Sequence, residues 1–224
     1  MQLNIFASTP VWQSELPNFK NHQQDFINLL YKLRNDMPNG VKISNINGYH
    51  SPSILQNVPE LKPLFDYIGQ MAKQACVDLN FVDCDVYITT AWSNFNDNRS
   101  CMNIDHVHGE TFSGCFYLQI PADSGQLVIS NPGLNRMWQG CSLCKEQNQF
   151  TVESIRLEPT EGQILLWPSY LYHAVTTNNH DDVRISLAFN IIAVPKREGE
   201  NIEPINNINP VEKVGLKKFN RNYI

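Results

Sequence analysis

The chain has 224 residues, of which 42% are hydrophobic and 17% are charged, and its formal net charge is −5. This length and composition predict one globular domain with a well-covered core, and the acidic balance argues against a nucleic-acid partner. No apolar run approaches the roughly 18 residues that a membrane-spanning helix needs, and the N-terminus lacks the basic and apolar stretches of a signal peptide, so we expect a cytoplasmic protein with no membrane partner.

The first 83 residues are expected to contain one strand and two helices that support the rest of the domain. Residues 3–12 predict a strand that ends at a Pro-containing turn. Apolar residues recur every three to four positions over about 18–35 and again over about 59–80, and this spacing predicts two amphipathic helices. The stretch SNINGYHSPSIL (44–55) between them contains a glycine and a proline and predicts a loop.

The hydrophobic period changes at residue 84. Short segments rich in β-branched and aromatic residues follow, separated by Gly, Pro, Asn or Asp, at 85–95, 114–120, 125–130, 150–159, 162–168, 172–177 and 184–194. They predict a mainly β core, a sandwich or a barrel, over 84–194. Residues 130–149 form a long connection, and the polar tail 195–224 is expected either to pack loosely or to contact a second copy of the chain in a homodimer.

The six cysteines are expected to be reduced thiols, because no secretory signal accompanies them. Cys141 and Cys144 form a C-x-x-C pair, but a structural zinc site needs a second pair of ligands at similar spacing. The sequence offers none, which favours a plain loop over a zinc knuckle.

The stretch DHVHGE (105–110) places two histidines and two carboxylates within six positions. In an extended segment, residues two apart point to the same side, so His106 and His108 can aim at one ion while Val107 turns away into apolar surroundings. A third ligand has to come from another strand. His173 follows an apolar strand that turns at Pro168, and it is well placed to close a three-ligand face. The alternative is a polar turn whose histidines bind no metal.

Arg184 and Ser186 share one face of the last predicted strand, RISLAFNI. A buried guanidinium without an anion is costly, and its planar fork suits a carboxylate, to which the Ser186 hydroxyl could also donate. The alternative is a structural ion pair of Arg184 with Asp181, Asp182 or another acidic side chain.

Taken together, H-x-H, a distant histidine and R-x-S on a mainly β chain resemble the Fe(II)/2-oxoglutarate-dependent oxygenases. The pattern is most similar to a bacterial and phage subgroup with an H-x-H motif. The likeness covers most of residues 5–194. Its further elements are TP-x-W (Thr9–Trp12), GYHS (48–51), H-x-H to SG-x-F-Y (106–117) and a Pro-to-Pro block (121–132).

This resemblance implies a double-stranded β-helix, or jelly roll, in a mainly β (α+β) chain with supporting N-terminal helices. It also implies Fe(II) as the metal, 2-oxoglutarate as cosubstrate and O2 as oxidant. The implied reaction is hydroxylation of an unidentified small-molecule or peptidyl substrate, with release of succinate and CO2. The competing interpretations are a three-histidine cupin that does not use 2-oxoglutarate (a dioxygenase, an isomerase or a small-molecule sensor), and a non-enzymatic β-sandwich binding module.

The resemblance assigns roles to individual residues. The metal ligands, which are also the catalytic residues, are His106, His108 and His173, with Glu110 as the alternative third ligand and Asp105 as an acceptor for a ligand imidazole. The distal carboxylate of 2-oxoglutarate falls to Arg184 and Ser186, with help from Tyr117. The pocket wall is assigned to Asn103 and Trp92. Trp167 and Tyr170 are expected either in the core or at the rim of the pocket, and the core is favoured.

Overall fold

The structure is a computed structural model that describes residues 9–97, 99, 101–133, 144–146, 148 and 151–196. Four of the predicted features fall wholly or partly outside these residues. They are the start of the N-terminal strand (3–8), most of the long connection 130–149, the C-x-x-C pair at its Cys141 end, and the polar tail from 197 onward. The division of the chain into 1–83, 84–194 and 195–224 stays a prediction.

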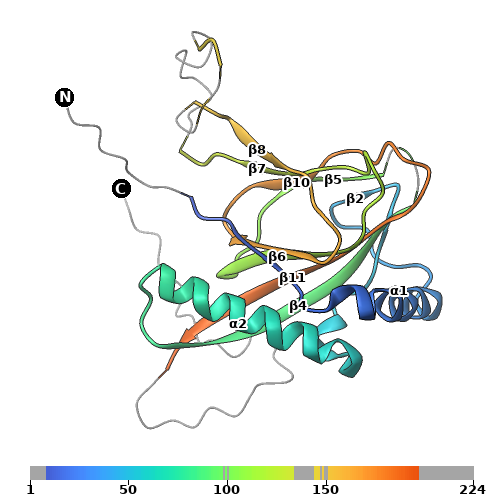
Figure 1. Cartoon of the computed structure of the whole chain (residues 1–224), viewed down its shortest axis with the longest axis horizontal. Helices are drawn as coiled ribbons and strands as arrows, with labels where there is room; N and C mark the ends of the chain where they lie inside the picture. Colours follow the sequence, from blue (N-terminus) through green and yellow to red (C-terminus); the bar gives the residue numbers. More distant parts are fainter. Residues whose placement is uncertain are drawn as a thin grey trace, which may run out of the picture.

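Two antiparallel sheets face each other across the middle of the molecule (Figure 1). The larger sheet has the order β1-β9-β6-β11-β4-β3, with bounds β1 (Trp12–Glu15), β9 (Gln163–Pro168), β6 (Phe112–Gln119), β11 (Arg184–Pro195), β4 (Cys84–Asn96) and β3 (Tyr49–His50). The smaller sheet has the order β2-β5-β10-β7-β8, with bounds β2 (Asn45–Ile46), β5 (Met102–His106), β10 (His173–Val175), β7 (Leu127–Ser130) and β8 (Ser154–Leu157).

From β4 onward the chain passes back and forth between the two sheets. It runs through β4, β6, β9 and β11 in the larger sheet and through β5, β7, β8 and β10 in the smaller one. This winding is the double-stranded β-helix, so the predicted fold class is confirmed. A small apolar cluster from β6, β7 and β9 fills the space between the sheets, and one end of that space holds polar side chains.

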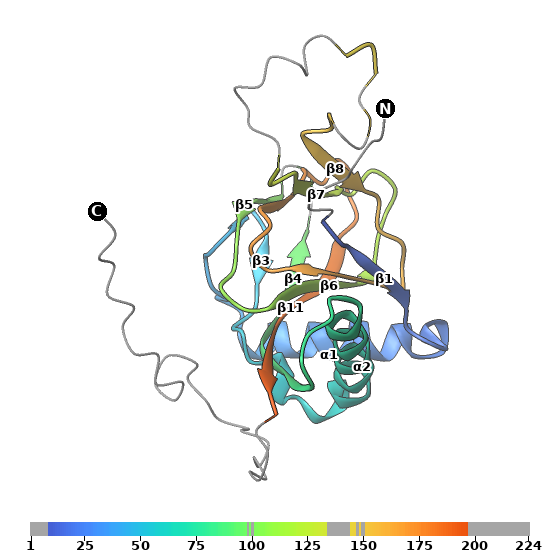
Figure 2. The same cartoon turned by 90° about the vertical axis from the view of Figure 1, so that its left-hand side faces the viewer.

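Two α-helices, α1 (Phe19–Asp36) and α2 (Lys62–Asp78), cover the outer face of the larger sheet (Figure 2). Two short 3-10 turns, η1 (Leu55–Asn57) and η2 (Pro59–Leu61), lead into α2. The apolar stripes of the helices join the outward-facing residues of β4, β6, β9 and β11 in the main hydrophobic core. Both helices were predicted within two or three residues of these ends. In the described part of the chain, neither helix is long and apolar enough to cross a membrane.

The sequence prediction was wrong for three short elements. Residues 9–11 are not in a strand, and β1 begins only at Trp12. The predicted loop 44–55 contains β2 and β3, because Asn47 adopts a left-handed φ of 58° and lets the chain reverse between them. The sequence did not predict a separate strand over 102–106, whereas the structure has β5 there, paired with β2 and β10 in the smaller sheet.

Candidate metal centre

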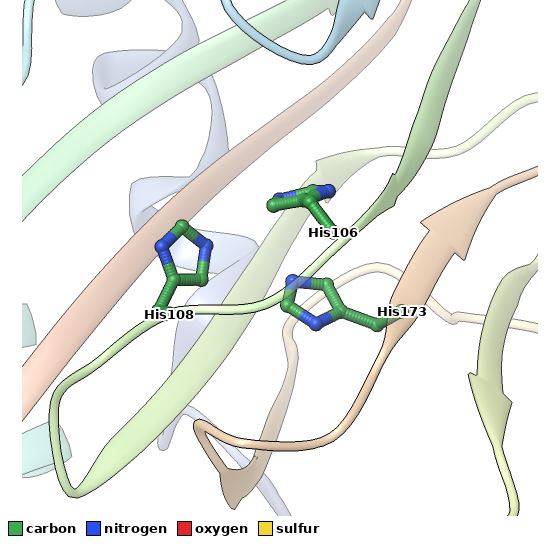
Figure 3. A group of neighbouring side chains, drawn as sticks. All are labelled: His106, His108 and His173. Carbon is green, nitrogen blue, oxygen red and sulfur yellow. The ribbon is translucent and has the colours of Figure 1, made fainter. Parts of the chain in front are cut away.

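Three histidine side chains meet between the two sheets (Figure 3). His106 ends β5, His108 lies in the following loop, and His173 begins β10, where it is the cross-strand partner of His106. Their candidate ligand nitrogens all lie within 4.8 Å of one another. The ring centroids are 4.4 Å apart for His106 and His173 and 5.0 Å apart for His106 and His108. No other trio of metal-ligating side chains gathers in this way among the described residues.

Backbone carbonyls orient two of the three rings. The Nδ1 atom of His106 lies 2.7 Å from the Ile104 carbonyl oxygen, and that of His173 lies 2.9 Å from the Leu171 carbonyl oxygen. When Nδ1–H donates to a carbonyl, Nε2 carries the lone pair that a metal needs. The His108 backbone N–H donates to the Ser169 carbonyl at 3.1 Å, which ties its loop to the β9–β10 turn.

Burial keeps two of the three imidazoles, those of His108 and His173, neutral. It lowers the pKa of His173 from 6.5 to about 3 and that of His108 from 6.5 to about 4, and the neighbouring histidines lower both further. A neutral imidazole is the form that binds a metal, and three imidazoles suit iron, zinc or copper better than magnesium or calcium. At neutral pH the site is therefore ready to receive a transition metal.

The residues around the H-x-H motif differ from the prediction in three ways. Glu110, the alternative third ligand, is not part of the cluster. Asp105 is exposed, and the acceptors that orient the rings of His106 and His173 are backbone carbonyls in its place. Val107 is 40% exposed and does not turn into apolar surroundings, because the strand ends at His106 and the chain then runs along the surface.

A buried arginine lies on the larger sheet at the start of β11. The Arg184 side chain is 1% exposed, and its Nη1 donates to Ser186 Oγ at 3.2 Å. Among the residues that the structure describes, its Nε and Nη2 have no hydrogen-bond partner. The predicted alternative, an ion pair with Asp181 or Asp182, is not found: Asp181 pairs with Arg99 at 2.7 Å, and Asp182 lies 3.6 Å from His180.

The Tyr117 ring packs beside this guanidinium, with 5.4 Å between its centroid and Arg184 Cζ. Its hydroxyl is buried with only the weakly polar Cys115 thiol beside it. Burial raises the pKa of Tyr117 well above 10, so the hydroxyl keeps its proton and can donate. Arg184, Ser186 and Tyr117 thus offer unused donors in one place.

A pocket connects the histidines with Ser186 and Tyr117. It holds about 470 Å³, counted with its open mouth. Its walls include the predicted Trp92 and Asn103. They also include residues that the sequence had not assigned to the pocket wall: Ser44, Asn94, Ser113, Gly114, Cys115, Leu127, Trp167, Ala174, Val175, Ala188, Phe189 and Asn190. Several of these residues lie an even number of positions from a predicted site residue on the same strand, as Asn190 does from Arg184 and Ser186 on β11. The period of two was the signal that could have found them.

Of the two aromatic residues expected in the core, Trp167 and Tyr170, only Trp167 is buried. Trp167 is buried as predicted, but it also lines the pocket, where its Nε1–H has no partner and its ring lies 5.0 Å from that of His173. The prediction for Tyr170 was wrong, because this side chain is 60% exposed in the turn after β9.

Residues 90–190 match a protein-family model described as "Putative 2OG-Fe(II) oxygenase". The matched segment runs from β4 to β11 and contains all three histidines, Arg184 and Ser186. This segment belongs to the 2OG-Fe(II) oxygenase family. No curated protein sequence matches the chain.

Two of the similar solved structures, a prolyl-4-hydroxylase and an epimerase, share the fold. A prolyl-4-hydroxylase from Pseudomonas putida is 13% identical over 85% of this chain and 95% of its own, with a TM-score of 0.58. The epimerase SnoN, in complex with Fe3+, α-ketoglutarate and nogalamycin RO, is 10% identical over 91% of this chain and 89% of its own, with a TM-score of 0.61. A 2OG-Fe(II) oxygenase-family oxidoreductase from Burkholderia pseudomallei is 16% identical over 61% of this chain, with a TM-score of 0.45, and the chain spans 57% of that protein.

The cofactors of this family are Fe(II) and 2-oxoglutarate, and the residues present fit both. Three imidazoles converge at one end of the pocket, and the buried guanidinium of Arg184, with two nitrogens that have no partner among the described residues, lies beside Ser186 and Tyr117. The first group suits a transition metal, and the second suits a carboxylate.

Proposed function

We propose that this protein is an Fe(II)- and 2-oxoglutarate-dependent hydroxylase. It would oxidise a C–H bond of an unidentified small-molecule or peptidyl substrate and convert 2-oxoglutarate to succinate and CO2. The observation that carries the proposal is the unpaired, buried guanidinium of Arg184, on the same sheet that lines the pocket of the three histidines.

The guanidinium is the feature that distinguishes the possible functions. A charged group that is fully buried without an anion costs several kcal/mol, so its persistence indicates a ligand that supplies the anion. The Ser186 hydroxyl and the protonated Tyr117 hydroxyl provide two further donors beside it. These donors suit the distal carboxylate of 2-oxoglutarate, and a three-histidine cupin without this cosubstrate has no use for them.

The spacing along β11 supports a ligand of the length of 2-oxoglutarate. Ser186 lines one end of the pocket, and Asn190, which contacts His108, lies four residues further on. Four residues of extended strand span about 13 Å. This distance is longer than an extended five-carbon dicarboxylate, so Ser186 and Asn190 can lie at the two ends of such a ligand.

The metal end of the pocket would be held by His106, His108 and His173. When bound there, Fe(II) supplies the chelation of the 2-oxo acid and the activation of O2 that the oxidation requires. The chain's own contribution is to orient the imidazoles and to keep bulk water away. The rings of Trp92 and Trp167 line the pocket beside the histidines, 5.7 Å from the His108 ring and 5.0 Å from the His173 ring.

The test is an anaerobic titration of the Fe(II)-loaded protein with 2-oxoglutarate. A visible metal-to-ligand charge-transfer band is expected, because the 2-oxo acid and the metal would chelate one another. Iron binding without a band, together with indifference to N-oxalylglycine, would favour the three-histidine cupin. Binding of neither ligand would favour a non-enzymatic β-sandwich module.

A further inference from the structure

A buried chain of polar side chains ends at the His108 ring. Asn190 Oδ1 accepts a hydrogen bond from Ser113 Oγ at 2.8 Å, and Ser113 Oγ lies 2.9 Å from Ser169 Oγ. On the other side of the amide, Asn190 Nδ2 donates to Thr90 Oγ1 at 3.1 Å and lies 3.4 Å from His108 Nδ1. These contacts connect the pocket to the centre of the larger sheet.

The register of the larger sheet fixes this chain in place. Asn190 on β11 is the cross-strand partner of Ser113 on β6 and of Thr90 on β4. The side chains of Asn190, Ser113 and Ser169 are all at most 3% exposed. Because β6, β11 and β4 are neighbouring inner strands, the amide of Asn190 is held beside the His108 ring by two partners that cannot move away.

The contact with Asn190 decides which nitrogen of His108 carries the proton. A neutral imidazole has one N–H and one lone pair. While Nδ2 of Asn190 donates to Nδ1, the proton lies on Nε2, and that nitrogen cannot bind a metal. A 180° turn of the amide places Oδ1 beside Nδ1. Nδ1–H then donates to Oδ1, and the lone pair of Nε2 is free.

The same chain accepts either orientation of the amide. The hydroxyls of Ser113 and Thr90 can each donate or accept, so both remain satisfied after the turn. Ser113 would then accept from Asn190 Nδ2 and donate to Ser169 Oγ, a pair in which either oxygen can be the donor. No group of the chain loses a partner, and the turn therefore carries little energetic cost.

We infer that Asn190 is the positioning residue of His108, and that its amide turns over on metal binding to accept the Nδ1 proton. The inference rests on the proposed function, because it takes His108 as a metal ligand. His106 and His173 have backbone carbonyls of Ile104 and Leu171 in this role. Of the three rings, His108 is the one whose orientation depends on a replaceable side chain.

The first test is a Co(II) titration of the full chain and three variants. Loss of a hydrogen-bond partner that orients a metal ligand typically weakens metal affinity about 10- to 100-fold, and we expect this for Asn190→Ala. Asn190→Asp keeps the acceptor and the volume, so its Co(II) affinity should stay close to that of the unaltered protein. Thr90→Val is the matched control, because it removes the amide's other partner without touching His108.

The second test reads the proton directly. In the Zn(II)-loaded protein with 15N-labelled histidine, we expect an Nδ1–H signal for His108 that is protected from solvent exchange. An Nε2–H signal for His108 would overturn the inference whether or not the variants fold. Equal Co(II) affinity of the unaltered protein and Asn190→Ala would also overturn it while leaving the proposed function intact. If the unaltered protein binds no Co(II), the proposed function itself is wrong.

Discussion

His106 and His173 are cross-strand partners in the β5–β10 pair, and their ring centroids lie 4.4 Å apart. The hydrogen bonds of a β-sheet therefore set the separation of two of the three candidate ligands. His108 lies outside the sheet, but its backbone N–H is bonded to Ser169. This arrangement predicts a site that keeps its shape without metal, because little chain ordering is left for the metal to bring about.

The ligand set can be tested by thermal stability. A ligand that binds the native state raises its stability, by about 2.7 kcal/mol at a concentration 100 times the Kd. We expect Co(II) to raise the Tm of the unaltered protein and of Glu110→Gln by the same amount. The Tm of His173→Gln should hardly change when Co(II) is added. Differential scanning calorimetry measures this. A loss of the Co(II) effect in Glu110→Gln would reinstate Glu110 as a ligand.

Replacement of Arg184 should separate cosubstrate binding from metal binding. Hydrogen bonds to a charged group contribute about 1.5–3 kcal/mol, so Arg184→Met should weaken 2-oxoglutarate binding about 10- to 100-fold or more. Metal affinity should hardly change. Calorimetric titrations with Co(II) and then 2-oxoglutarate give both constants. Equal loss of both would mean that Arg184 has a structural role.

The same variant makes an opposite prediction for the free protein. Because Nε and Nη2 of Arg184 have no partner in the described part of the chain, removal of the buried charge should leave the unfolding free energy unchanged or raise it. Urea unfolding of the metal-free and cosubstrate-free protein measures this. A large destabilisation by Arg184→Met would show that the guanidinium has a partner within the fold.

Tyr117→Phe removes one hydroxyl and retains the ring that packs beside Arg184. The hydroxyl contributes a hydrogen bond only when a ligand is present, so we expect 2-oxoglutarate affinity to fall by roughly 3- to 10-fold, as for loss of one hydrogen bond of about 0.5–1.5 kcal/mol. The stability of the free protein should stay the same. Cys115→Ala, on the same strand face, is the control and should not change the affinity by as much.

The sequence predicted most strands of the β-helix and singled out the three histidines that the structure brings together, because both depend on local patterns. Period-two stretches identify strands, and the H-x-H and R-x-S motifs each place two side chains on one face of an extended segment. The same local reasoning predicted that Arg184, in an apolar strand, needs an anion, and its binding of a carboxylate stays a prediction.

The remaining features depend on where a strand ends and on which strands pair. Val107 was expected to be buried because the extended segment was taken to continue past His106, but β5 stops there. Asn190 and Ser113 are far apart in sequence, and only the β6–β11 register brings them together. Nothing in the local sequence encodes that register, so the polar chain behind His108 was not predictable.

The low pKa values of the buried histidines predict how the stability of the metal-free protein depends on pH. In the unfolded chain a histidine takes up a proton near pH 6.5, whereas His108 and His173 in the folded protein do so only near pH 4 and pH 3. Between these values the unfolded state binds more protons, so the unfolding free energy should fall as the pH is lowered from 7 toward 4.

Carboxylates whose folded pKa is lowered add to the loss of stability at the acid end, so the effect of the histidines has to be measured by comparison with a variant. In urea unfolding at pH 7, 6 and 5, His173→Gln should lose stability less steeply than the unaltered protein, because its unfolded state takes up one proton fewer. Parallel curves for the two proteins would contradict the burial of a neutral imidazole at position 173, and with it the readiness of the site for a metal.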